Sequence, residues 1–402
     1  MKTDVTIMSR LFWPRRFGGL EHVLWQLSNA LVDCGVSLTV LAERVEGVPD
    51  LQDARHGLRI RRQAPIDFGR LWRVGELVQV RWWMKALRQA PHDGWLWANE
   101  PTAAVAAIRS GRAKDLIYRP VFCYDALHHV AQTHPEMHAL SRSRLARWLD
   151  RYAYRHAAHV IEESHNLRGQ HLKHYGGRPR LHVVHNGVAT AQELPASRGA
   201  FGLSPDDFVV GFVGRPGDPC KDLPFLLRAL QKQTHQQNLR LLIVGGGDGL
   251  DDARRQVQAA GLESRTTWTG AVTDPAAAYR TMDVMALPSR FETFGNVLLE
   301  AQSYGVPAVA RRRDGNTPAP IYTASDELID HRKTGLTVDP HDPADLAAAL
   351  QQLIDNPEET RAMGAAAAFQ QAGNTWHKTA QAYLDLINLP AAQHRPSPKQ
   401  AA

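Results

Sequence analysis

Two glutamates, Glu292 and Glu300, lie eight residues apart in a segment that is otherwise suited to burial. The pattern predicts a buried strand over Asp283–Leu287 and a helix over Val297–Ala301, so the two acids flank a loop-to-helix junction. Carboxylates accept hydrogen bonds from hydroxyl groups, and the first turn of a helix binds anions. The spacing therefore predicts a ligand with hydroxyls at both ends and phosphate between them, as in a nucleotide sugar.

The junction itself is formed by Phe294 and Gly295. A helix that begins there leaves backbone N–H groups unpaired and carries a partial positive charge at its first turn. Gly305 and Pro307 predict where this helix ends. We expect the backbone at Phe294 and Gly295 to meet a phosphate group.

Arg215 and Lys221 could supply cations for the same ligand. They follow a predicted strand over Phe208–Val213 and lie on one loop before the next helix. Arg binds phosphate through a planar fork and Lys as a point charge, although both could simply be solvated surface charges. The sequence contains no Asp-x-Asp motif and no His, Cys and carboxylate cluster with metal-ligand spacing. We therefore expect a site that uses neither a metal nor a cofactor.

Glycine clusters precede two further helices. Gly18 and Gly19 lead into a predicted helix over Leu24–Val32, and Gly245–Gly249 follows a predicted strand. Each cluster either lets the backbone approach phosphate or only forms a tight turn, and the sequence leaves both readings open. Neither has the GxGxxG spacing, which argues against a dinucleotide-dependent oxidoreductase.

Asp125 and His128 follow a strand predicted over Leu116–Phe122. Ligands of parallel α/β sheets bind beyond the carboxyl ends of the strands, so either side chain is a candidate for contacting a reacting sugar. The sequence does not decide between the two. An isolated histidine is usually an ordinary surface residue, and most of the 19 histidines in this chain must be of that kind.

Length and composition limit the class of protein. The 402 residues are 44% hydrophobic, which is enough for two ordinary cores. No run approaches the roughly eighteen apolar residues of a membrane span, and the polar residues 1–8 do not form a signal peptide. The three cysteines have no disulfide or metal spacing. These features predict a cytoplasmic protein.

The net charge of +6 is uneven, because residues 1–190 carry +10 and the remainder carries −4. Basic and aromatic residues are mixed over Arg70–Arg88 and again over Ser141–Arg155. Such segments either lie on an anionic membrane surface or form solvated helix faces. We expect an anionic lipid or a phosphorylated acceptor as partner, with peripheral contact at the inner face of the plasma membrane. No nucleic-acid-binding motif accompanies the charge.

Short apolar runs alternate with helix-length segments along the chain, which predicts an α/β fold with parallel sheets. We predict two tandem doubly wound, Rossmann-like domains that face each other across a cleft. Residues 1–190 would bind the acceptor and 191–374 the nucleotide sugar, while a helix over 375–390 crosses back and 391–402 form a flexible tail. The predicted strands are Val5–Met8, Leu38–Leu41, Leu58–Arg62, Trp95–Ala98, Leu116–Phe122, His159–Glu162, Leu181–Val184, Phe208–Val213, Leu239–Val244, Thr266–Thr269, Val284–Leu287, Ala308–Ala310 and Leu336–Val338.

The segment Pro288–Ala301, followed by Gly305-Val306-Pro307, resembles the signature of retaining GT-B glycosyltransferases of group 1, also called family 4. The resemblance covers nearly the whole chain. Its supporting parts are Gly18-Gly19, His185–Val188, Val213–Arg215 with Lys221-Asp222, and Gly245–Gly249.

The resemblance implies a metal-independent enzyme that moves a sugar, with retained configuration, from a nucleotide diphosphate donor to an acceptor hydroxyl. The donor would be a UDP-sugar, the commonest donor in such proteins, and the acceptor a glycan or lipid-linked molecule of bacterial envelope polysaccharide or lipopolysaccharide synthesis. Glu300 would bind the ribose and Glu292 the transferred sugar. The other implied donor-binding residues are Gly18, Gly19, Arg215, Lys221, Gly270, Val272, Phe294 and Gly295.

Two departures from the family pattern leave roles open. The family often has a His-Asp pair where this sequence reads Tyr124-Asp125, and the turn before Glu327 lacks the family's glycines. A nucleotide-sugar 2-epimerase on the same scaffold is an alternative that would act on the donor without an acceptor. A non-catalytic nucleotide-sugar-binding protein is another, and it would not hydrolyse the donor.

Overall fold

The computed structural model describes residues 4–14, 18–66, 68, 75–91, 93–189, 197–233 and 235–388. Residues 190–196 at the predicted domain boundary, part of the first basic segment (70–74) and the predicted tail (391–402) lie outside the described residues. The chain forms two compact units. The first contains Met1–His129, Leu140–Gly187 and Trp376–Ala402, and the second contains Val130–Ala139 and Val188–Thr375.

The first unit is built on a sheet whose described strands have the order β3-β4-β2-β1-β5-β6-β7-β8. Neighbouring strands pair in parallel except β3, which pairs antiparallel with β4 at one edge. The strands are β1 (Asp4–Met8), β2 (Ser37–Glu43), β3 (Leu51–Arg55), β4 (Leu58–Gln63), β5 (Trp95–Ala98), β6 (Leu116–Tyr118), β7 (His159–Glu162) and β8 (Leu181–Val183). The helices are α1 (Gly19–Asp33), α2 (Gly75–Leu87), α3 (Pro101–Arg109), α4 (Tyr124–Thr133), α5 (Arg144–His156), α6 (His165–Tyr175) and α14 (Trp376–Asn388).

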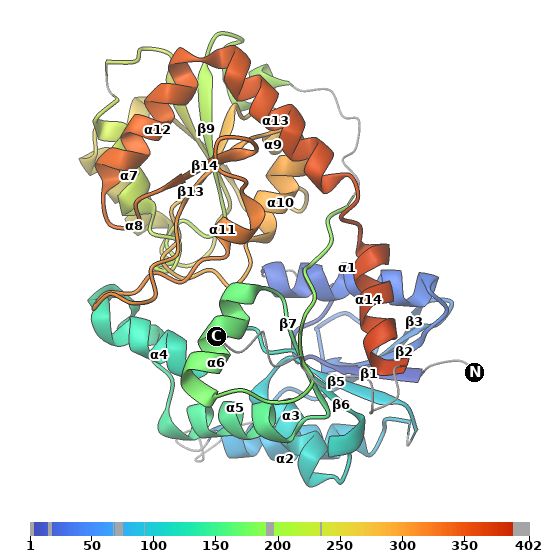
Figure 1. Cartoon of the computed structure of the whole chain (residues 1–402). Helices are drawn as coiled ribbons and strands as arrows, with labels where there is room; N and C mark the ends of the chain where they lie inside the picture. The colour runs from blue at the N-terminus through green and yellow to red at the C-terminus, as the bar shows by residue number, and fades with distance from the viewer. Residues whose placement is uncertain are drawn as a thin grey trace. The chain divides into compact units, whose positions relative to one another are not determined.

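Helices cover both faces of this sheet, with α1 and α14 on one side and α2, α3 and α5 on the other (Figure 1). Because successive strand residues point to opposite faces, a strand covered on both faces is largely apolar along its whole length. Val5 and Ile7 of β1 pack into a core that α1 and α14 share. Thr6 and Met8, which point the other way, are also buried.

The C-terminal helix α14 is part of the first unit although its sequence follows the second. Tyr383 of α14 stacks on Trp97 of β5 with ring centroids 4.5 Å apart. Nε of Arg119 donates a 3.0 Å hydrogen bond to the Tyr383 hydroxyl inside the core. This helix therefore completes the hydrophobic layer above β1 and β5.

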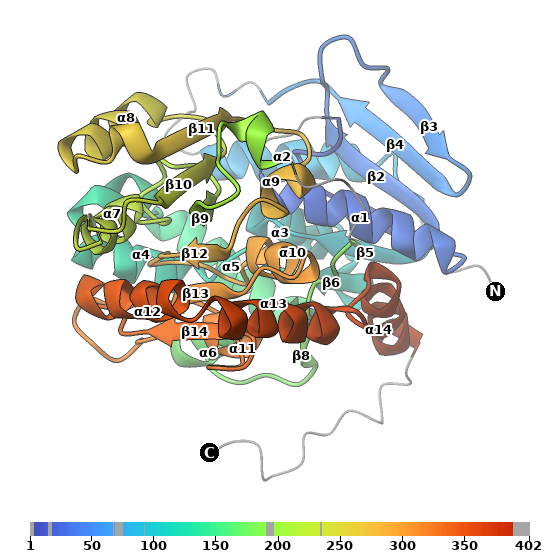
Figure 2. The same ribbon diagram turned by 90° about the horizontal axis from the view of Figure 1, so that it is seen from above.

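The second unit has a parallel sheet with the order β11-β10-β9-β12-β13-β14 among its described strands, which Figure 2 shows in that sequence. The strands are β9 (Phe208–Val213), β10 (Leu239–Val244), β11 (Thr266–Gly270), β12 (Val284–Leu287), β13 (Ala308–Arg311) and β14 (Gly335–Val338). The helices are α7 (Leu223–Gln231), α8 (Leu250–Ala259), α9 (Ala276–Tyr279), α10 (Asn296–Ser303), α11 (Ser325–Leu328), α12 (Pro343–Asp355) and α13 (Pro357–Gln371).

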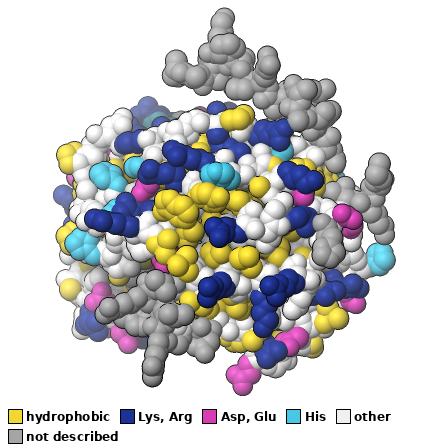
Figure 3. Space-filling view, turned by 90° about the horizontal axis from the view of Figure 1, so that it is seen from below, with side chains coloured by type: hydrophobic (Ala, Val, Ile, Leu, Met, Phe, Trp, Pro, Cys, Tyr) yellow, Lys and Arg dark blue, Asp and Glu magenta, His cyan; other side chains and the backbone are white. Residues whose placement is uncertain are grey.

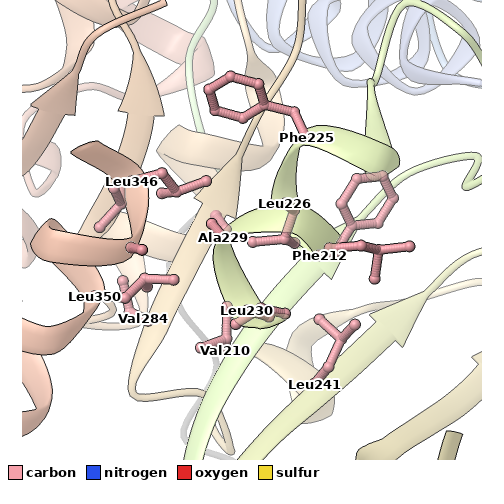
Figure 4. Close-up of a cluster of buried hydrophobic side chains, with 14 of the residues drawn as sticks. Val210, Phe212, Phe225, Leu226, Ala229, Leu230, Leu241, Val284, Leu346 and Leu350 are labelled. Carbon is pink, nitrogen blue, oxygen red and sulfur yellow. The ribbon is translucent and has the colours of Figure 1, made fainter. Parts of the chain in front are cut away.

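The second unit's core lies on both faces of its sheet. On one face, Val210 and Phe212 of β9 pack with α7 and α12, as Figure 4 shows with Leu226, Leu230 and Leu350. On the other face, alternate strand residues pack with α9 and α10. Packing on both faces fixes the positions of the carboxyl ends of β9 and β12, where the loops with the predicted site residues begin.

The predicted α/β fold with two parallel-sheet units is confirmed, and three local predictions were wrong. The strand expected over Leu116–Phe122 ends at Tyr118, since Pro120 has no backbone N–H to continue the ladder. The antiparallel strand β3 was missed, because its residues are largely polar and exposed. Helix α1 begins at Gly19 and not near Leu24. No helix within the described ranges has the length and apolar content needed to cross a membrane.

Candidate active site

The loop after β9 and the loop after β12 bring Lys221 and Glu292 together. Nζ of Lys221 lies 2.5 Å from Oε2 of Glu292, although 71 residues separate them in the sequence. Burial lowers the pKa of Lys221, but the charge and hydrogen bond of Glu292 raise it more, so the net pKa is raised. Their side chains are 19% and 15% exposed, respectively. The ion pair is therefore mostly buried, with a small part of each side chain exposed.

A second set of charges holds Lys221 in place through its neighbour Asp222. Asp222 has φ of +46°, a strained conformation for a residue other than glycine, and it precedes the first residue of α7. Its carboxylate Oδ2 lies 2.6 Å from Nη1 of Arg311 and 2.9 Å from Nε of Arg290. Burial lowers the pKa of Arg311 to about 10, which leaves it charged at neutral pH. The buried ion pairs compensate for the backbone strain next to Lys221.

Backbone hydrogen bonds fix the loop that carries Glu292. The N–H of Arg290 donates to the carbonyl of Cys220 at 2.8 Å, which joins this loop to the one that carries Lys221. The N–H of Glu292 donates to the carbonyl of Tyr322 at 2.7 Å. The two loops therefore position the ion pair as one assembly.

Gly295 forms the start of α10, as the sequence predicted for the junction. Its φ is +102°, a conformation that favours glycine. Within the described residues no side-chain hydrogen bond caps this helix start. A Cβ at Gly295 would lie 3.6 Å from Cγ of Glu292, so the glutamate side chain runs beside the helix start. Phe294 is 1% exposed and anchors the junction in the core. An anion placed here would meet the helix dipole and Lys221 together.

Glu300 lies further along α10 and faces a different partner. The hydroxyl of Tyr279 in α9 donates a 2.8 Å hydrogen bond to Oε2 of Glu300. Burial raises the pKa of Glu300 to about 7, although the bond from Tyr279 lowers it. The two acids are thus on one helix-and-loop segment but have separate partners, as expected of groups that bind two ends of a ligand.

Arg215 lies on the same loop as Lys221 but in a more open place. Its side chain is 62% exposed, and Nη2 lies 2.5 Å from Oδ2 of Asp218. A Cβ at Gly247 would lie 3.6 Å from Cδ of Arg215, so the arginine stem passes over the glycine-rich turn after β10. Arg215 is free to swing onto a ligand at small cost, because an exposed ion pair contributes little. Its role as a diphosphate ligand stays a prediction.

The glycine-rich turn after β10 has a clear packing reason. A Cβ at Gly245 would lie 1.9 Å from the carbonyl oxygen of Gly214, a severe clash with backbone. The N–H of Gly245 donates to the carbonyl of Gly270, the last residue of β11, at 3.0 Å. Val272 beyond β11 is 42% exposed and available to a ligand. The predicted nucleobase role of Gly270 and Val272 stays a prediction.

Asp125 and His128 both lie on α4 in the first unit, in its first turns. Asp125 is 9% exposed and binds two arginines of α5, at 3.0 Å to Nη1 of Arg147 and 2.7 Å to Nη2 of Arg151. Nδ1 of His128 lies 2.7 Å from Oγ of Ser141, and burial lowers the pKa of His128. The two ion pairs of Asp125 hold α4 against α5. Among the residues that the structure describes, His128 has a single side-chain hydrogen bond, with Ser141, so its structural role is smaller than that of Asp125. Neither role toward a sugar is tested by these contacts.

Gly18 and Gly19 lie at the start of α1. Gly18 has an extended backbone and Gly19 is the first helical residue. A Cβ at Gly18 would lie 3.2 Å from Oε2 of Glu21, a tight contact that a small residue avoids. Their predicted contact with the donor stays a prediction.

The fold also assembles a buried cluster that sequence spacing could not show. Ligand-type atoms of Cys123, Asp150 and His171 lie within 4.8 Å of one another. The carboxylate of Asp150 already accepts hydrogen bonds from the hydroxyls of Tyr118 at 2.5 Å and Tyr175 at 2.6 Å. Asp150 therefore serves as the centre of a buried hydrogen-bond network that joins α5 to β6 and α6.

Sequence reasoning gave no role to four residues that support the site. Tyr279 and Asp218 contact predicted site residues directly, whereas Asp222 and Arg311 act through the backbone of Lys221. Asp222 and Arg311 are 89 residues apart, and no short-range pattern signals such a pair. Of the four, the sequence analysis points only to Asp222, because it follows Lys221 within the motif.

Comparison with known proteins defines the class of this fold. The structure of a sucrose-phosphate synthase from Thermosynechococcus elongatus is similar with a TM-score of 0.82 and 20% identity, covering 96% of this chain and 98% of that one. HepE from Anabaena in complex with UDP-glucose is similar with a TM-score of 0.73 and 20% identity, covering 96% and 99%. The two units therefore have the GT-B architecture.

Sequence comparison identifies the family. Residues 207–356 match the family model described as "Glycosyl transferases group 1", and residues 17–192 match "Glycosyltransferase Family 4". The chain belongs to this family of glycosyltransferases. It is 35% identical over 247 residues to a D-inositol 3-phosphate glycosyltransferase from Rhodococcus opacus, a match that covers 58% of this chain and 52% of the relative. The chain thus matches about half the length of that relative.

Proposed function

We propose that this enzyme transfers a sugar from a UDP-sugar to an acceptor hydroxyl with retention of the anomeric configuration. The observation that supports it most is the Lys221–Glu292 ion pair beside the start of α10. It places a cation, a helix dipole and a carboxylate within reach of one ligand. The similarity to a structure that contains UDP-glucose supports the choice of nucleotide.

The ion pair suggests how the donor is received. Without donor, the charge of Lys221 is neutralised by Glu292. A diphosphate would draw the ammonium away, and the released carboxylate would then accept hydrogen bonds from hydroxyls of the transferred sugar. The pair therefore exchanges one internal contact for two contacts with the ligand.

Charge that develops on the departing UDP would be met by the first turn of α10 and by Lys221 and Arg215, once donor binding has drawn these two side chains onto the diphosphate. Preorganised groups of this kind usually contribute the largest catalytic effect. The bond between the anomeric carbon and the phosphate oxygen breaks while the acceptor oxygen bonds the same face of that carbon. The departing phosphate oxygen takes the acceptor's proton, so no protein base is needed.

Substitution of the site cations tests the assignment. We expect Lys221→Ala to lower the rate of UDP release from a UDP-sugar by about 10²–10³-fold, because a preorganised donor to developing charge is lost. The control is Lys232→Ala, which removes an exposed cation of the same unit. A Lys221→Ala enzyme with the unchanged rate of the control would disprove the role of the pair.

Product analysis tests retention. Proton NMR of the sugar released at early times distinguishes the two anomers before they interconvert. An inverted product would contradict the proposed mechanism. Conversion of the donor sugar into its 2-epimer, without net UDP release, would instead favour an epimerase.

We further propose that the acceptor is anionic and that the first unit works at an anionic membrane surface. Two helices of this unit expose cations with apolar groups: Arg81 with Leu77 on α2, with Arg88 just beyond its end, and Arg144 and Arg155 with Trp148 on α5. Oγ of Ser143 donates a 2.7 Å hydrogen bond to Glu76, so the starts of the two helices adjoin. Figure 3, which looks from below the view of Figure 1, shows hydrophobic side chains interspersed with Lys and Arg.

Vesicle binding tests the membrane proposal. Leu77 and Trp148 are 46% and 56% exposed, so their replacement costs little stability. We expect binding to vesicles that contain phosphatidylglycerol, loss of binding at high salt, and weaker binding of Trp148→Ala. Equal binding to vesicles of phosphatidylcholine alone would contradict an electrostatic surface.

A further inference from the structure

A cavity of about 550 Å³ lies in the first unit, between the sheet edge and α2. It is lined by residues of β4 and of the segment before β3, and by residues on the later half of α2. The charged and aromatic lining residues are Arg44, Asp50, Arg61, Arg62, Trp82 and Lys85. Four cations thus face the same space as one carboxylate.

The single carboxylate is already neutralised. Both oxygens of Asp50 pair with the guanidinium of Arg44, with 2.7 Å between Nε and Oδ1. Among the described residues, Arg61, Arg62 and Lys85 form no ion pair. The lining therefore carries four cations and one carboxylate, an excess of positive charge.

Arg62 is the most deeply buried cation of the lining. It is 5% exposed, and its terminal nitrogens donate only to neutral acceptors: the carbonyls of Pro49 at 2.9 Å and Trp13 at 3.0 Å, and the side chain of Gln52 at 3.1 Å. Nε of Arg62 and Nε of Arg61 are buried without a hydrogen-bond partner. Burial lowers the pKa of Arg62, and the nearby charge of Asp50, which is already paired with Arg44, offsets this only in part. An anion in the cavity would offset more of the cost of burying this cation.

Trp82 gives the cavity an apolar wall of fixed orientation. Its Nε1 donates a 2.8 Å hydrogen bond to the carbonyl of Ala64, and its own carbonyl accepts a 3.3 Å bond from Gln63. Trp82 thus lines the same cavity as the cations, and its indole N–H already has a hydrogen-bond partner. A flat apolar wall next to an anion site suits a sugar ring that carries a phosphate group.

The cavity lies at the edge of the sheet where ligands bind. Arg44 follows the last residue of β2, and Gln63 is the last residue of β4, so both mark carboxyl ends of parallel strands. Figure 2 shows β2, β4 and β3 side by side at this edge. The bond from Arg62 to Trp13 also ties the cavity to the segment that leads from β1 toward Gly18.

We propose that this cavity binds the phosphate group of a phosphorylated sugar, with Arg61, Arg62 and Lys85 as its ligands and Trp82 against the ring. The molecule would be the acceptor, an inference that rests on the proposed transfer reaction. The name of the Rhodococcus relative, which refers to a phosphorylated inositol, agrees with an acceptor of this chemistry.

The test uses glucose 6-phosphate and the full-length protein. Calorimetry should detect glucose 6-phosphate binding and no binding of glucose. We expect the double variant Arg61→Ala/Lys85→Ala to bind glucose 6-phosphate at least about tenfold more weakly. Each lost charge-assisted hydrogen bond to an anion lowers affinity by roughly a factor of ten. The control Arg109→Ala/Lys114→Ala removes the same charge from exposed positions outside the cavity, and it should bind as the wild type does.

UDP binding, measured on the same samples, separates the two proposals. UDP binding that persists without glucose 6-phosphate binding would overturn the cavity assignment and leave the proposed transfer reaction standing. Equal weakening in both double variants would show a general charge effect and also overturn it. A third outcome is that glucose 6-phosphate does not bind, while vesicles of phosphatidic acid bind to the wild type and the control but not to Arg61→Ala/Lys85→Ala. The cations would then bind a lipid phosphate, and the proposal would be wrong.

Discussion

The hydroxyl of Tyr279 lies 2.8 Å from Oε2 of Glu300 and donates a hydrogen bond to that carboxylate. Burial opposes ionisation of Glu300 more strongly than this bond favours it, so its pKa is raised to about 7. The group proposed to hold the ribose therefore changes charge within the physiological pH range. Two consequences can be measured, one for binding and one for stability.

The affinity for UDP should rise with pH through 7. Ribose hydroxyls donate hydrogen bonds, so they bind the ionised form of Glu300, and that form is the minor one below its pKa of about 7. We expect the dissociation constant to fall roughly tenfold between pH 6 and pH 8, in proportion to the ionised fraction. Calorimetric titration of UDP over this range measures it.

Glu300→Gln is the control for this prediction. UDP still titrates in the presence of this variant, but the carboxyl group at position 300 is gone. We expect weaker binding by this variant and a flatter pH profile. A profile as steep as that of the wild type would assign the pH dependence to UDP and not to Glu300.

The stability of the protein should fall with rising pH because of Glu300, whereas the affinity for UDP should rise. The pKa of Glu300 rises from an ordinary value of 4.5 when unfolded to about 7 when folded, so the folded state binds the proton more tightly. Its contribution to stability is complete below pH 4.5 and is lost as pH rises through 7. We expect Glu300→Gln to melt above the wild type at pH 8 and not at pH 4.5.

Glu292→Gln should separate donor affinity from turnover. The substitution removes the carboxylate that holds Nζ of Lys221, so the ammonium is free to bind phosphate. UDP lacks the transferred sugar that Glu292 would contact, and we expect UDP binding to be unchanged or tighter. Turnover of a UDP-sugar should fall, because the hydroxyls of the sugar lose their acceptor. A large loss of UDP affinity would contradict the proposed exchange of partners.

Asp222→Ala should destabilise the second unit. The substitution leaves Arg311, which is 3% exposed, without its counter-charge, and such a loss costs about 3 kcal/mol of the free energy of unfolding. Asp252→Ala, which breaks the exposed pair with Arg255, should cost less than about 1 kcal/mol. Urea unfolding of both variants compares them, and equal midpoints would show that the buried network contributes little.

The strands of the second unit could be predicted almost residue by residue, because a strand buried on both faces is a short apolar run between turn residues. The bounds predicted for β9, β10 and β12 agree with the structure. Strand β3 could not be found in this way, since an exposed edge strand with polar residues has no such pattern. For β6, Pro120 was the available signal, and the apolar residues around it hid it.

The site was predictable as a set of loops but not as a set of partners. Glu292, Gly295 and Glu300 follow a local motif, and the structure places them at one strand end, as expected. The choice of Lys221 as the partner of Glu292 depends on β9 and β12 being neighbours in the sheet. Asp125 shows the limit of motif reasoning, because its arginine partners lie 22 and 26 residues further along the chain.

Helix α14 has a consequence for the order of events during synthesis. The hydrophobic layer above β1 and β5 includes Trp376 and Tyr383, which the ribosome adds only after the whole second unit. Until these residues leave the ribosome, the apolar side chains of α1 and the neighbouring strands that pack against α14 remain exposed. Since contacts between distant parts of a chain form slowly and exposed apolar surface aggregates, the N-terminal half depends on the last helix, or on a chaperone in its place, to reach its native state.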